Sequence, residues 1–283
     1  MLENFQSFYS EDDQLLKIKP HLDRFGFDKG SKMSLTVETK VWEKDWRFIL
    51  KHGFIKQVML GVGRAATKRL LLINNVDSPT LVARYAEQLI KDGVLDNYVF
   101  VDDYAGAALE FFCLRKSDLG KGYYYSIAEL VSIYLCDTDY LAHFSGDATV
   151  PKGVPASWLQ DAISLLKERA DVSVVNLAWD YKFKEVDKDS IFVDDEFAYG
   201  YGFSDQMYVI RTAEFKSRIY GYSHPESDRY PKYGGDLFEK RVDSWMRVEK
   251  RLRATSRKWS YRHSNFPNWN SLEGVLLRMR RAR

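Results

Sequence analysis

Hydrophobic and polar residues follow two periods along this chain of 283 residues. Short apolar or β-branched runs predict strands, and apolar residues three or four positions apart predict helices. The predicted strands are 33–39, 69–75, 97–102, 140–144, 171–179 and 206–212, and the predicted helices are 43–59, 77–93, 123–136, 156–170 and 237–253. Up to residue 180 the two kinds of element take turns, which favours a parallel sheet with helices on both faces.

The helix predicted over 77–93 carries its own boundary signals. Asp77 or Ser78 suits the cap, Pro79 suits the first helical position, and Gly93 suits the end. Residues 1–32 show no strong period and are interpreted as an N-terminal extension. After Asp180 the pattern loosens into turns, so we divide the remainder into a regular half, 33–180, and a second half, 181–283.

The composition is typical of a soluble globular protein, with 45% hydrophobic and 29% charged residues. Two cysteines, Cys113 and Cys136, provide no disulfide framework and suit a reducing compartment. The first residues lack the basic start and apolar stretch of a signal peptide. No apolar run approaches the ~20 residues that span a bilayer. We therefore expect a cytoplasmic protein.

Charge is distributed unevenly along the chain. Residues 239–283 contain 13 Lys and Arg against 4 Asp and Glu, whereas the remainder contains 29 against 36. This basic tail suggests an anionic partner, namely nucleic acid, a membrane surface or a phosphate-bearing substrate, and the alternative is a solvated helix face. Within the tail, residues 247–263 interleave Lys and Arg with Trp259 and Tyr261, a composition that also suits phosphates and stacked bases.

Two acidic motifs flank the strand at 140–144. Asp137-Thr138-Asp139 precedes it and Ser145-Gly146-Asp147 follows it. Extended chain would separate Asp139 from Asp147 by roughly 26 Å, so the two carboxylates cannot share a site. Ligands of an open parallel sheet bind beyond the carboxyl ends of its strands, which favours Asp147. Gly146 would let the backbone approach a ligand closely. The alternative for Asp147 is a turn carboxylate that caps its own backbone.

The order of these motifs resembles the nucleotide-binding half of a GT-A glycosyltransferase, most nearly the inverting enzymes of glycosyltransferase family 2. The resembling features are the strands up to residue 102, the Gly120-Lys121-Gly122 turn, the helix after it, and Ser145-Gly146-Asp147 in the position of the D-x-D motif. Residues 199–211 resemble the acceptor-side loop and strand, and 233–245 resemble the segment that carries the catalytic carboxylate. Two departures are Ser145 in place of the first Asp, and Glu38-Thr39 in place of Pro-Thr.

The resemblance implies a GT-A fold: a Rossmann-like, mostly parallel sheet with helices on both faces and a C-terminal helical acceptor region. It implies Asp236 as general base, with Glu239 as the substitute, and Asp147 as the ligand of Mn²⁺ or Mg²⁺. It also implies that Asp205 and Tyr233 contact the acceptor. The implied nucleotide-sugar contacts are Thr39, Asn74, Asn75, Asp77, Lys121, Ser145 and Asp147.

Each of these assignments has a structural alternative. Asp236 and Glu239 have the spacing of a helix capping box. The Asn and Asp residues at 74–77 are also usual in a strand-to-helix turn. His143 is interpreted as a core histidine, and either His224 or His263 could be a late metal ligand.

We therefore expect an inverting, metal-assisted glycosyltransferase that acts on a nucleotide-diphosphate sugar and a glycan or lipid-linked acceptor. A weak contact of the basic tail with anionic membrane is expected as well. A sugar-phosphate nucleotidyltransferase is an alternative, although residues 38–46 lack the glycines of a phosphate loop. The third alternative is a non-enzymatic nucleic-acid-binding module, whereas the glycosyltransferase interpretation expects no nucleic acid.

Overall fold

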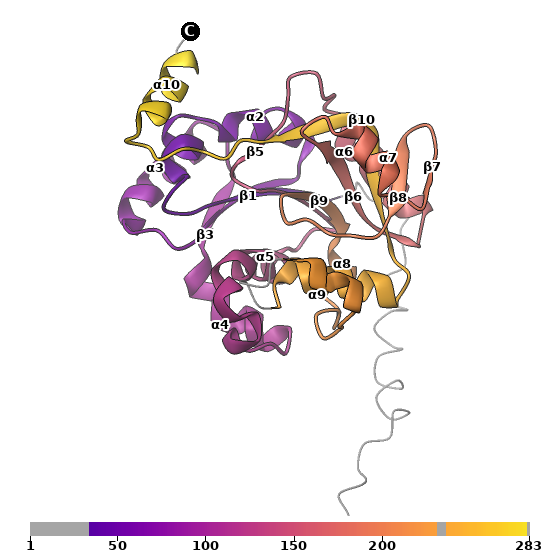
Figure 1. Ribbon diagram of the computed structural model, residues 1–283. Coiled ribbons are helices and arrows are strands. Elements are labelled where there is room, and N and C mark those ends of the chain that lie inside the picture. The colour runs from indigo at the N-terminus through magenta and orange to yellow at the C-terminus, as the bar shows by residue number, and fades with distance from the viewer. Residues whose placement is uncertain (1–33, 231–235, 282–283) are drawn as a thin grey trace, which may run out of the picture. The chain divides into compact units, whose positions relative to one another are not determined.

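The computed structural model describes residues 34–230 and 236–281 (Figure 1). The N-terminal extension predicted over 1–32 lies outside the described residues. From Ser34 onward the chain forms one compact unit around a single sheet. The strands are β1 (Leu35–Val41), β2 (Lys68–Ile73), β3 (Asn97–Phe100), β4 (Tyr140–Phe144), β5 (Ala148–Thr149), β6 (Val172–Trp179), β7 (Phe192–Val193), β8 (Phe197–Gly200), β9 (Met207–Arg211) and β10 (Leu252–His263).

The strand order is β3-β2-β1-β4-β9-β6-β10-β8-β7, with β5 paired to β10. β1 pairs in parallel with β2 and β4, and β6 pairs in parallel with β10. β9 lies antiparallel between β4 and β6, so β4 and β6 point the same way. The carboxyl ends of β1, β2, β4, β6 and β10 therefore meet at one edge of the sheet, where ligands of such sheets bind.

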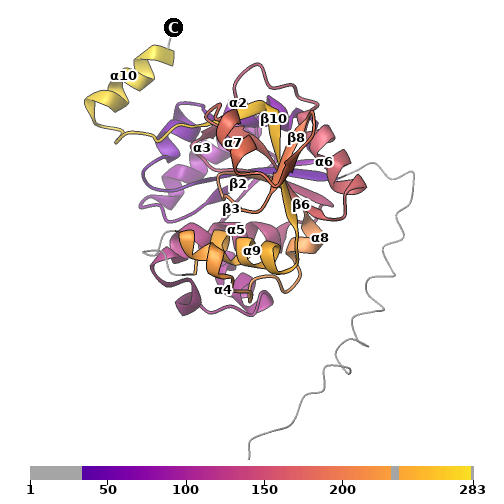
Figure 2. The same ribbon diagram turned by 45° about the vertical axis from the view of Figure 1, so that its right-hand side comes forward.

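Helices cover both faces of the sheet, as Figures 1 and 2 show. One face carries α4 (Val101–Phe111), α5 (Tyr123–Leu135), α8 (Thr212–Phe215) and α9 (Phe238–Val248). The other carries α2 (Ile55–Met59), α3 (Pro79–Lys91), α6 (Trp158–Glu168) and α7 (Phe183–Lys188). The remaining helical segments are η1 (Arg47–Lys51), η2 (Val62–Ala65), η3 (Lys116–Gly122), η4 (Pro225–Arg229) and α10 (Leu272–Arg281). The predicted α/β class, with a mostly parallel sheet and helices on both faces, is confirmed.

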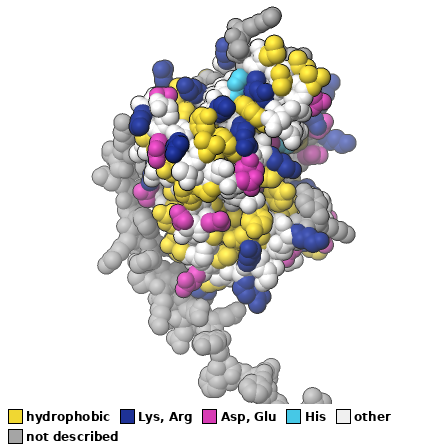
Figure 3. All heavy atoms as spheres, turned by 90° about the vertical axis from the view of Figure 1, so that its left-hand side faces the viewer, with side chains coloured by type: hydrophobic (Ala, Val, Ile, Leu, Met, Phe, Trp, Pro, Cys, Tyr) yellow, Lys and Arg dark blue, Asp and Glu magenta, His cyan; other side chains and the backbone are white. Residues whose placement is uncertain are grey.

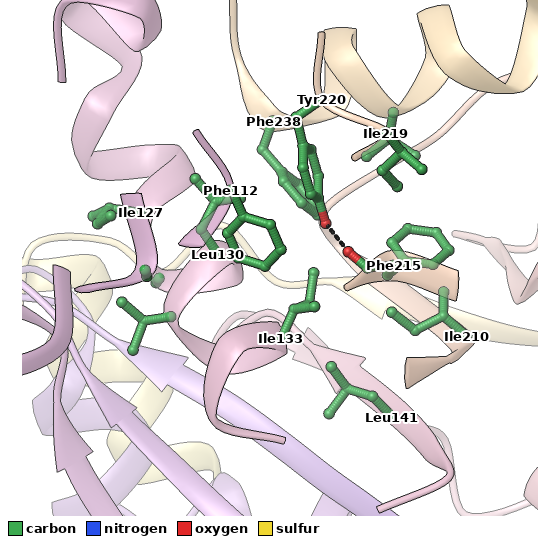
Figure 4. Packing of buried hydrophobic residues seen from close by; sticks show 14 of the residues in the cluster. Phe112, Ile127, Leu130, Ile133, Leu141, Ile210, Phe215, Ile219, Tyr220 and Phe238 are labelled. Carbon is green, nitrogen blue, oxygen red and sulfur yellow. Dashed lines mark hydrogen bonds between the residues drawn. The ribbon is translucent and has the colours of Figure 1, made fainter. Parts of the chain in front are cut away.

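One hydrophobic core cluster lies between the sheet and the helices α4, α5, α8 and α9 (Figure 4). The helix predicted from Leu237 presents an apolar stripe to this core, because Phe238, Val242, Trp245 and Met246 are all buried. Burial of each such side chain contributes about 1.5–3 kcal/mol. The Tyr220 hydroxyl reaches into this core and donates to the Phe215 carbonyl at 2.8 Å.

The single helix predicted over 43–59 is wrong. A π-helical turn, η1, ends at Lys51, and the separate helix α2 starts at Ile55. Gly53 lies between them with φ of +81°, a conformation that interrupts a right-handed helix. The apolar spacing was correct for both pieces, since Phe48, Ile49 and Ile55 are buried.

The strand predicted over 97–102 is too long. β3 ends at Phe100, and α4 begins at the next residue with Asp102 and Asp103 in its first turn. Acidic residues stabilise the positive end of a helix dipole, so the two aspartates favour a helix start at this point. The helix α4 was not predicted.

The basic helix predicted from 237 to 253 ends early, at Val248. Residues 252–263 form β10, which pairs along β6 and β8 in the middle of the sheet. The region expected to be helical, 181–283, thus contains α7, α8, α9 and α10 but also contributes strands β7 to β10 to the sheet. Cys113 and Cys136 are both free thiols, as expected. Among the described residues, no helix is long and apolar enough to cross a membrane.

Candidate active site

A cavity of about 330 Å³ opens beyond the carboxyl ends of β1, β2 and β4. Its walls come from five segments of the chain that are distant in sequence. The lining residues are Lys40, Val41, Trp42, Asp45, Asn74, Asn75, Lys121, Tyr124, Tyr125, Ser145, Asp147, Asp205 and Gln206. We refer to this cavity as the strand-end cavity.

Six residues singled out in the sequence line the strand-end cavity together: Asn74, Asn75, Lys121, Ser145, Asp147 and Asp205. Others lie elsewhere. Thr39 is buried within β1, and Asp77 is exposed, with its backbone N–H donated to Glu43. Neither residue lines the cavity, nor do Asp236 and Glu239. The predicted acceptor residue Tyr233 lies outside the described residues.

Asp139 and Asp147 lie at opposite ends of β4. Asp139 accepts hydrogen bonds from the backbone N–H and the hydroxyl of Ser34, at the edge where β1 and β4 begin. Asp147 lies past the other end of β4, in the wall of the strand-end cavity. The two carboxylates are thus placed as strand polarity predicts.

Asp147 forms a close pair with His263 at the end of β10. The Asp147 Oδ2 and His263 Nε2 atoms are 2.9 Å apart. Burial acts to raise the pKa of Asp147, but the bond with His263 and the charge of Lys40 hold it below its usual value. The same hydrogen bond raises the pKa of His263. Within the described part of the chain, the buried Oδ1 of Asp147 has no hydrogen-bond partner.

The Ser145-Gly146-Asp147 turn packs directly on the end of β1. A Cβ at Gly146 would lie 2.4 Å from the Lys40 carbonyl oxygen and 2.3 Å from Ile49 Cδ1. It would also lie 3.2 Å from Asp45 Oδ2, so glycine allows the buried Asp45 carboxylate to approach the turn. Burial raises the pKa of Asp45 well above its usual value, and the nearby charge of Asp147 adds to this. A second carboxyl group, that of Asp45, therefore lies beside the Ser145-Gly146-Asp147 turn.

Lys40 forms the charged floor of the cavity. Its ammonium bonds to the fully buried Glu129 of α5 and lies 3.5 Å from Asp205 Oδ2. Burial disfavours the charge, but Glu129 and Asp205 outweigh that effect and raise the pKa of Lys40. Burial raises the pKa of Glu129. Lys40 therefore keeps a positive charge between two acidic partners.

A buried polar layer lies beneath this floor. The predicted core histidine His143 is fully buried, and its Nδ1 is 2.8 Å from Glu38 Oε1. The Ser132 hydroxyl also donates to Glu38. These residues join β1, β4 and α5, so the layer fixes the strands that carry Lys40 and Asp147.

An amide and two aromatic rings line the other side of the cavity. Asn74 Nδ2 donates to the Tyr124 carbonyl at 2.7 Å, and the buried Asn74 Oδ1 has no partner among the described residues. Tyr124 and Tyr125 are 48% and 52% exposed, although they begin an otherwise buried helix. Exposed rings beside an unpaired amide oxygen suit a planar polar ligand such as a nucleobase.

The capping box considered for Asp236 and Glu239 is not formed. The N-cap of α9 is Leu237, without a side-chain capping bond. Asp236 is exposed, with Oδ1 3.0 Å from the Lys240 ammonium. Glu239 Oε1 accepts the backbone N–H of Asp205 at 2.9 Å. Burial, together with the Asp205 carboxylate, raises the pKa of Glu239 well above its usual value.

The residues present fit a divalent cation that is completed by ligand oxygens. No group of three or more His, Cys, Asp or Glu side chains could hold a metal ion within residues 34–230 and 236–281. The unpaired Oδ1 of Asp147 nevertheless offers one oxygen, and His263 Nε2, now bonded to Asp147 Oδ2, would offer a nitrogen if the cation took the place of that bond. A bound diphosphate would supply further oxygens, which Mn²⁺ and Mg²⁺ accept.

Several residues of the site were not predicted from the sequence. Lys40 lies at the carboxyl end of β1, and Trp42 and Asp45 lie in the stretch that follows it, where strand polarity places ligands. That polarity was a usable signal for Lys40 and Asp45. His263 was considered a metal ligand, but its place beside Asp147 follows from β10, which was not predicted.

Comparisons with known proteins give structural similarity only. No protein-family model matches the chain, and no curated protein sequence matches it. Among solved structures, glucosyl-3-phosphoglycerate synthase from Mycobacterium tuberculosis, in complex with Mn²⁺, UDP and glucosyl-3-phosphoglycerate, gives a TM-score of 0.44 at 12% identity. That match covers 88% of this chain and 76% of the synthase.

The same synthase with Mg²⁺ and UDP gives a TM-score of 0.45 at 13% identity, covering 83% of this chain and 73% of that one. S. aureus TarS, residues 1–349, gives a TM-score of 0.42 at 12% identity, covering 82% of this chain and 60% of that one. At these identities and TM-scores, the similarities assign neither a family nor an activity to the chain.

Proposed function

We propose that this chain is a GT-A glycosyltransferase that moves a sugar from a nucleotide-diphosphate sugar to a hydroxyl acceptor. The observation that carries the proposal is the strand-end cavity, which gathers an amide, a lysine and a partly unpaired carboxylate from three separate strand ends and turns. Asn74, Lys121 and Asp147 are among the residues that the sequence analysis expects at the donor site, and all three line this cavity.

The donor is proposed to lie across the cavity. Asn74 Oδ1 and the faces of Tyr124 and Tyr125 would receive the base, and Lys121 would approach the diphosphate. Asp147 and His263 would hold Mn²⁺ or Mg²⁺. When bound, that cation supplies positive charge to the leaving diphosphate. Lys40 adds a fixed positive charge to the same floor.

In the proposed reaction an acceptor oxygen bonds to the anomeric carbon as the bond from that carbon to the diphosphate breaks. The acceptor proton passes to a carboxylate, and direct displacement inverts the anomeric configuration. Asp236 and Glu239 are the proposed bases. Glu239 is the better placed of the two, because its Oε1 accepts the backbone N–H of Asp205 in the cavity wall and its raised pKa makes the ionised carboxylate a stronger base.

A panel of nucleotide-diphosphate sugars, with and without Mn²⁺, tests the proposal by calorimetry and by release of nucleoside diphosphate. We expect one nucleotide to bind more tightly with the metal. Absence of binding by every nucleotide in both conditions would contradict the proposal.

Two amide variants test which of the two carboxylates is the general base. Replacing the true base by its amide should lower transfer at least about a hundredfold while donor affinity stays within a few-fold, because the base acts on the acceptor. Asp236→Asn and Glu239→Gln are compared in the same assay. Unchanged transfer in both variants would remove both residues as bases.

A glycan or lipid-linked acceptor and weak attachment to anionic membrane are part of the proposal. Figure 3 shows hydrophobic and basic side chains side by side near the top of one face, where α10 lies in Figure 1. Leu272, Leu276 and Met279 of α10 are exposed at helical spacing. By contrast, the nucleic-acid alternative loses support, because Tyr261 is buried in β10 and offers no face for base stacking.

A further inference from the structure

A second cavity, about 480 Å³ in volume, contains three arginines that the proposed donor site does not use. We call it the arginine pocket. Arg229 ends η4, Arg247 is in the last turn of α9, and Arg253 is in β10. The other lining residues are Trp179, Asp189, Ile191, Tyr201, Phe203 and Tyr230.

Two of the guanidinium groups converge on one point. Gly202 has φ of +121°, and a Cβ there would lie 2.8 Å from Arg229 Nη2 and 2.9 Å from Arg253 Nη1. These two nitrogens therefore lie within about 6 Å of each other. A phosphate group can bridge nitrogens at this separation, since charged N–H···O bonds are about 2.8 Å long.

The carboxylates around the pocket do not neutralise all of its guanidinium groups. The buried Asp243 accepts from Arg247 Nε at 3.0 Å and from Arg229 Nη2 at 3.4 Å, and it also accepts the Ser227 hydroxyl at 2.6 Å. Asp189 is the one carboxylate among the lining residues. Three guanidinium groups thus face two carboxylates.

Arg253 is the least satisfied of the three arginines. Its Nε is buried and has no hydrogen-bond partner in the part of the chain that the structure describes. A buried charged donor without an acceptor is costly, and an anion in the pocket would supply one. The aromatic rings of Tyr201, Tyr230 and Trp179 provide apolar walls for the rest of such a ligand.

The arginine pocket adjoins the strand-end cavity. Phe203 lines the former, and Asp205 and Gln206 line the latter. On the sheet, Trp179 pairs with Tyr261, two residues before His263. We propose that the arginine pocket binds a phosphate group through Arg229, Arg247 and Arg253. This inference rests on the proposed function: if the chain transfers a sugar, the acceptor is a phosphate-bearing compound that the arginine pocket holds beside the donor.

Calorimetry of the full-length chain with inorganic phosphate tests the site, with acetate and glycerol as carboxylate and neutral probes. We expect Arg229→Ala and Arg253→Met each to weaken phosphate binding about tenfold or more, the loss of one charged hydrogen bond. Arg218→Ala removes an exposed arginine that does not line the pocket and should change binding less than about twofold. The Arg229 side chain is half exposed, so Arg229→Ala should fold even if Arg253→Met does not.

The Asp147→Asn variant distinguishes phosphate binding in the arginine pocket from phosphate binding in the strand-end cavity. Phosphate binding that survives this variant and falls in Arg229→Ala supports the arginine pocket, even if no nucleotide sugar binds and the proposed transfer is wrong. Equal phosphate binding by the wild type and Arg229→Ala would overturn the inference, as would a loss confined to Asp147→Asn. If acetate binds as tightly as phosphate, the pocket selects anions in general, and the assignment to a phosphate group is overturned.

Discussion

The surroundings of a carboxylate in this protein depend on which end of a strand carries it. Asp139 precedes β4 and is hydrogen-bonded to Ser34, whereas Asp147 follows β4, lines the strand-end cavity and pairs with His263. Strand direction was enough to predict this difference. It was not enough to predict Asp45 beside Gly146, because that contact depends on how the turn after β1 folds back.

We expect Asp147→Asn to weaken metal-dependent binding of a nucleoside diphosphate at least about tenfold, because the amide removes the negative charge that the cation needs. Asp139→Asn is the matched control and should bind as the wild type does. Calorimetry with Mn²⁺ measures both. Weaker binding in Asp139→Asn than in Asp147→Asn would reverse the assignment.

Glu239 gives stability a dependence on pH. Its pKa is raised in the folded protein by burial and by Asp205, so the folded state holds the proton more tightly than the unfolded state. Unfolding free energy should therefore fall as pH rises above the unfolded value of about 4.3. Glu239→Gln cannot ionise and should remove this loss.

The measurement is urea denaturation of both proteins between about pH 4 and pH 8. The wild type should lose stability relative to Glu239→Gln across this range. A difference that stays constant with pH, or grows in favour of the wild type, would contradict the raised pKa.

Elements with a single period were predicted well, and elements that change period were not. α5 and β4 have nearly the predicted bounds, since each is buried along almost its whole length and keeps one period. β10 was missed because it follows the amphipathic α9 without a proline, and its alternation is broken between Thr255 and Ser260. Arg257 and Lys258 interrupt a strand whose residues on either side, 254–256 and 260–261, are buried.

The exposed face of α10 makes a prediction about membranes. Leu272, Leu276 and Met279 are 75%, 46% and 62% exposed on one side of a helix that also carries arginines. Each basic residue near an anionic surface contributes about 1 kcal/mol, which gives weak and reversible attachment. We expect the full chain to sediment with anionic vesicles at low salt and not with neutral ones.

Two variants separate the contributions to this binding. Deleting 274–283 should weaken sedimentation, and Leu276→Glu with Met279→Glu should do so while leaving the basic residues in place. Equal sedimentation with anionic and neutral vesicles would leave α10 as a solvated surface.

The two halves divided at residue 180 share one sheet. β9, from the second half, lies between β4 and β6, and β10 covers the other edge of β6. The apolar runs predicted β1, β2, β3, β4 and β6 of the first half, but not that later strands insert among them, because pairing order depends on long-range contacts. The two halves are therefore not separate structural domains, and the division at residue 180 describes only their proposed roles.

We expect a fragment of residues 34–180 not to fold, because both edges of β6 and one edge of β4 would lose their partners. The full chain should unfold in one cooperative transition. Circular dichroism and thermal melting of both proteins check this. A fragment that melts cooperatively, with the far-ultraviolet spectrum of a folded α/β protein, would show that the first half is independent.

β10 contains a bulge between its two ends, where it has more residues than the facing part of β6. Thr255 pairs with Asn176 and Ser260 with Ala178, so four residues of β10 lie opposite a single residue of β6. The Ser256 hydroxyl accepts the backbone N–H groups of Lys258 and Trp259 and closes this excess length into a local turn. Insertions or deletions there would be absorbed without moving Arg253 or His263. Natural variants of this chain could therefore differ in length at this position and keep both cavities, and a reporter peptide inserted there would leave them in register.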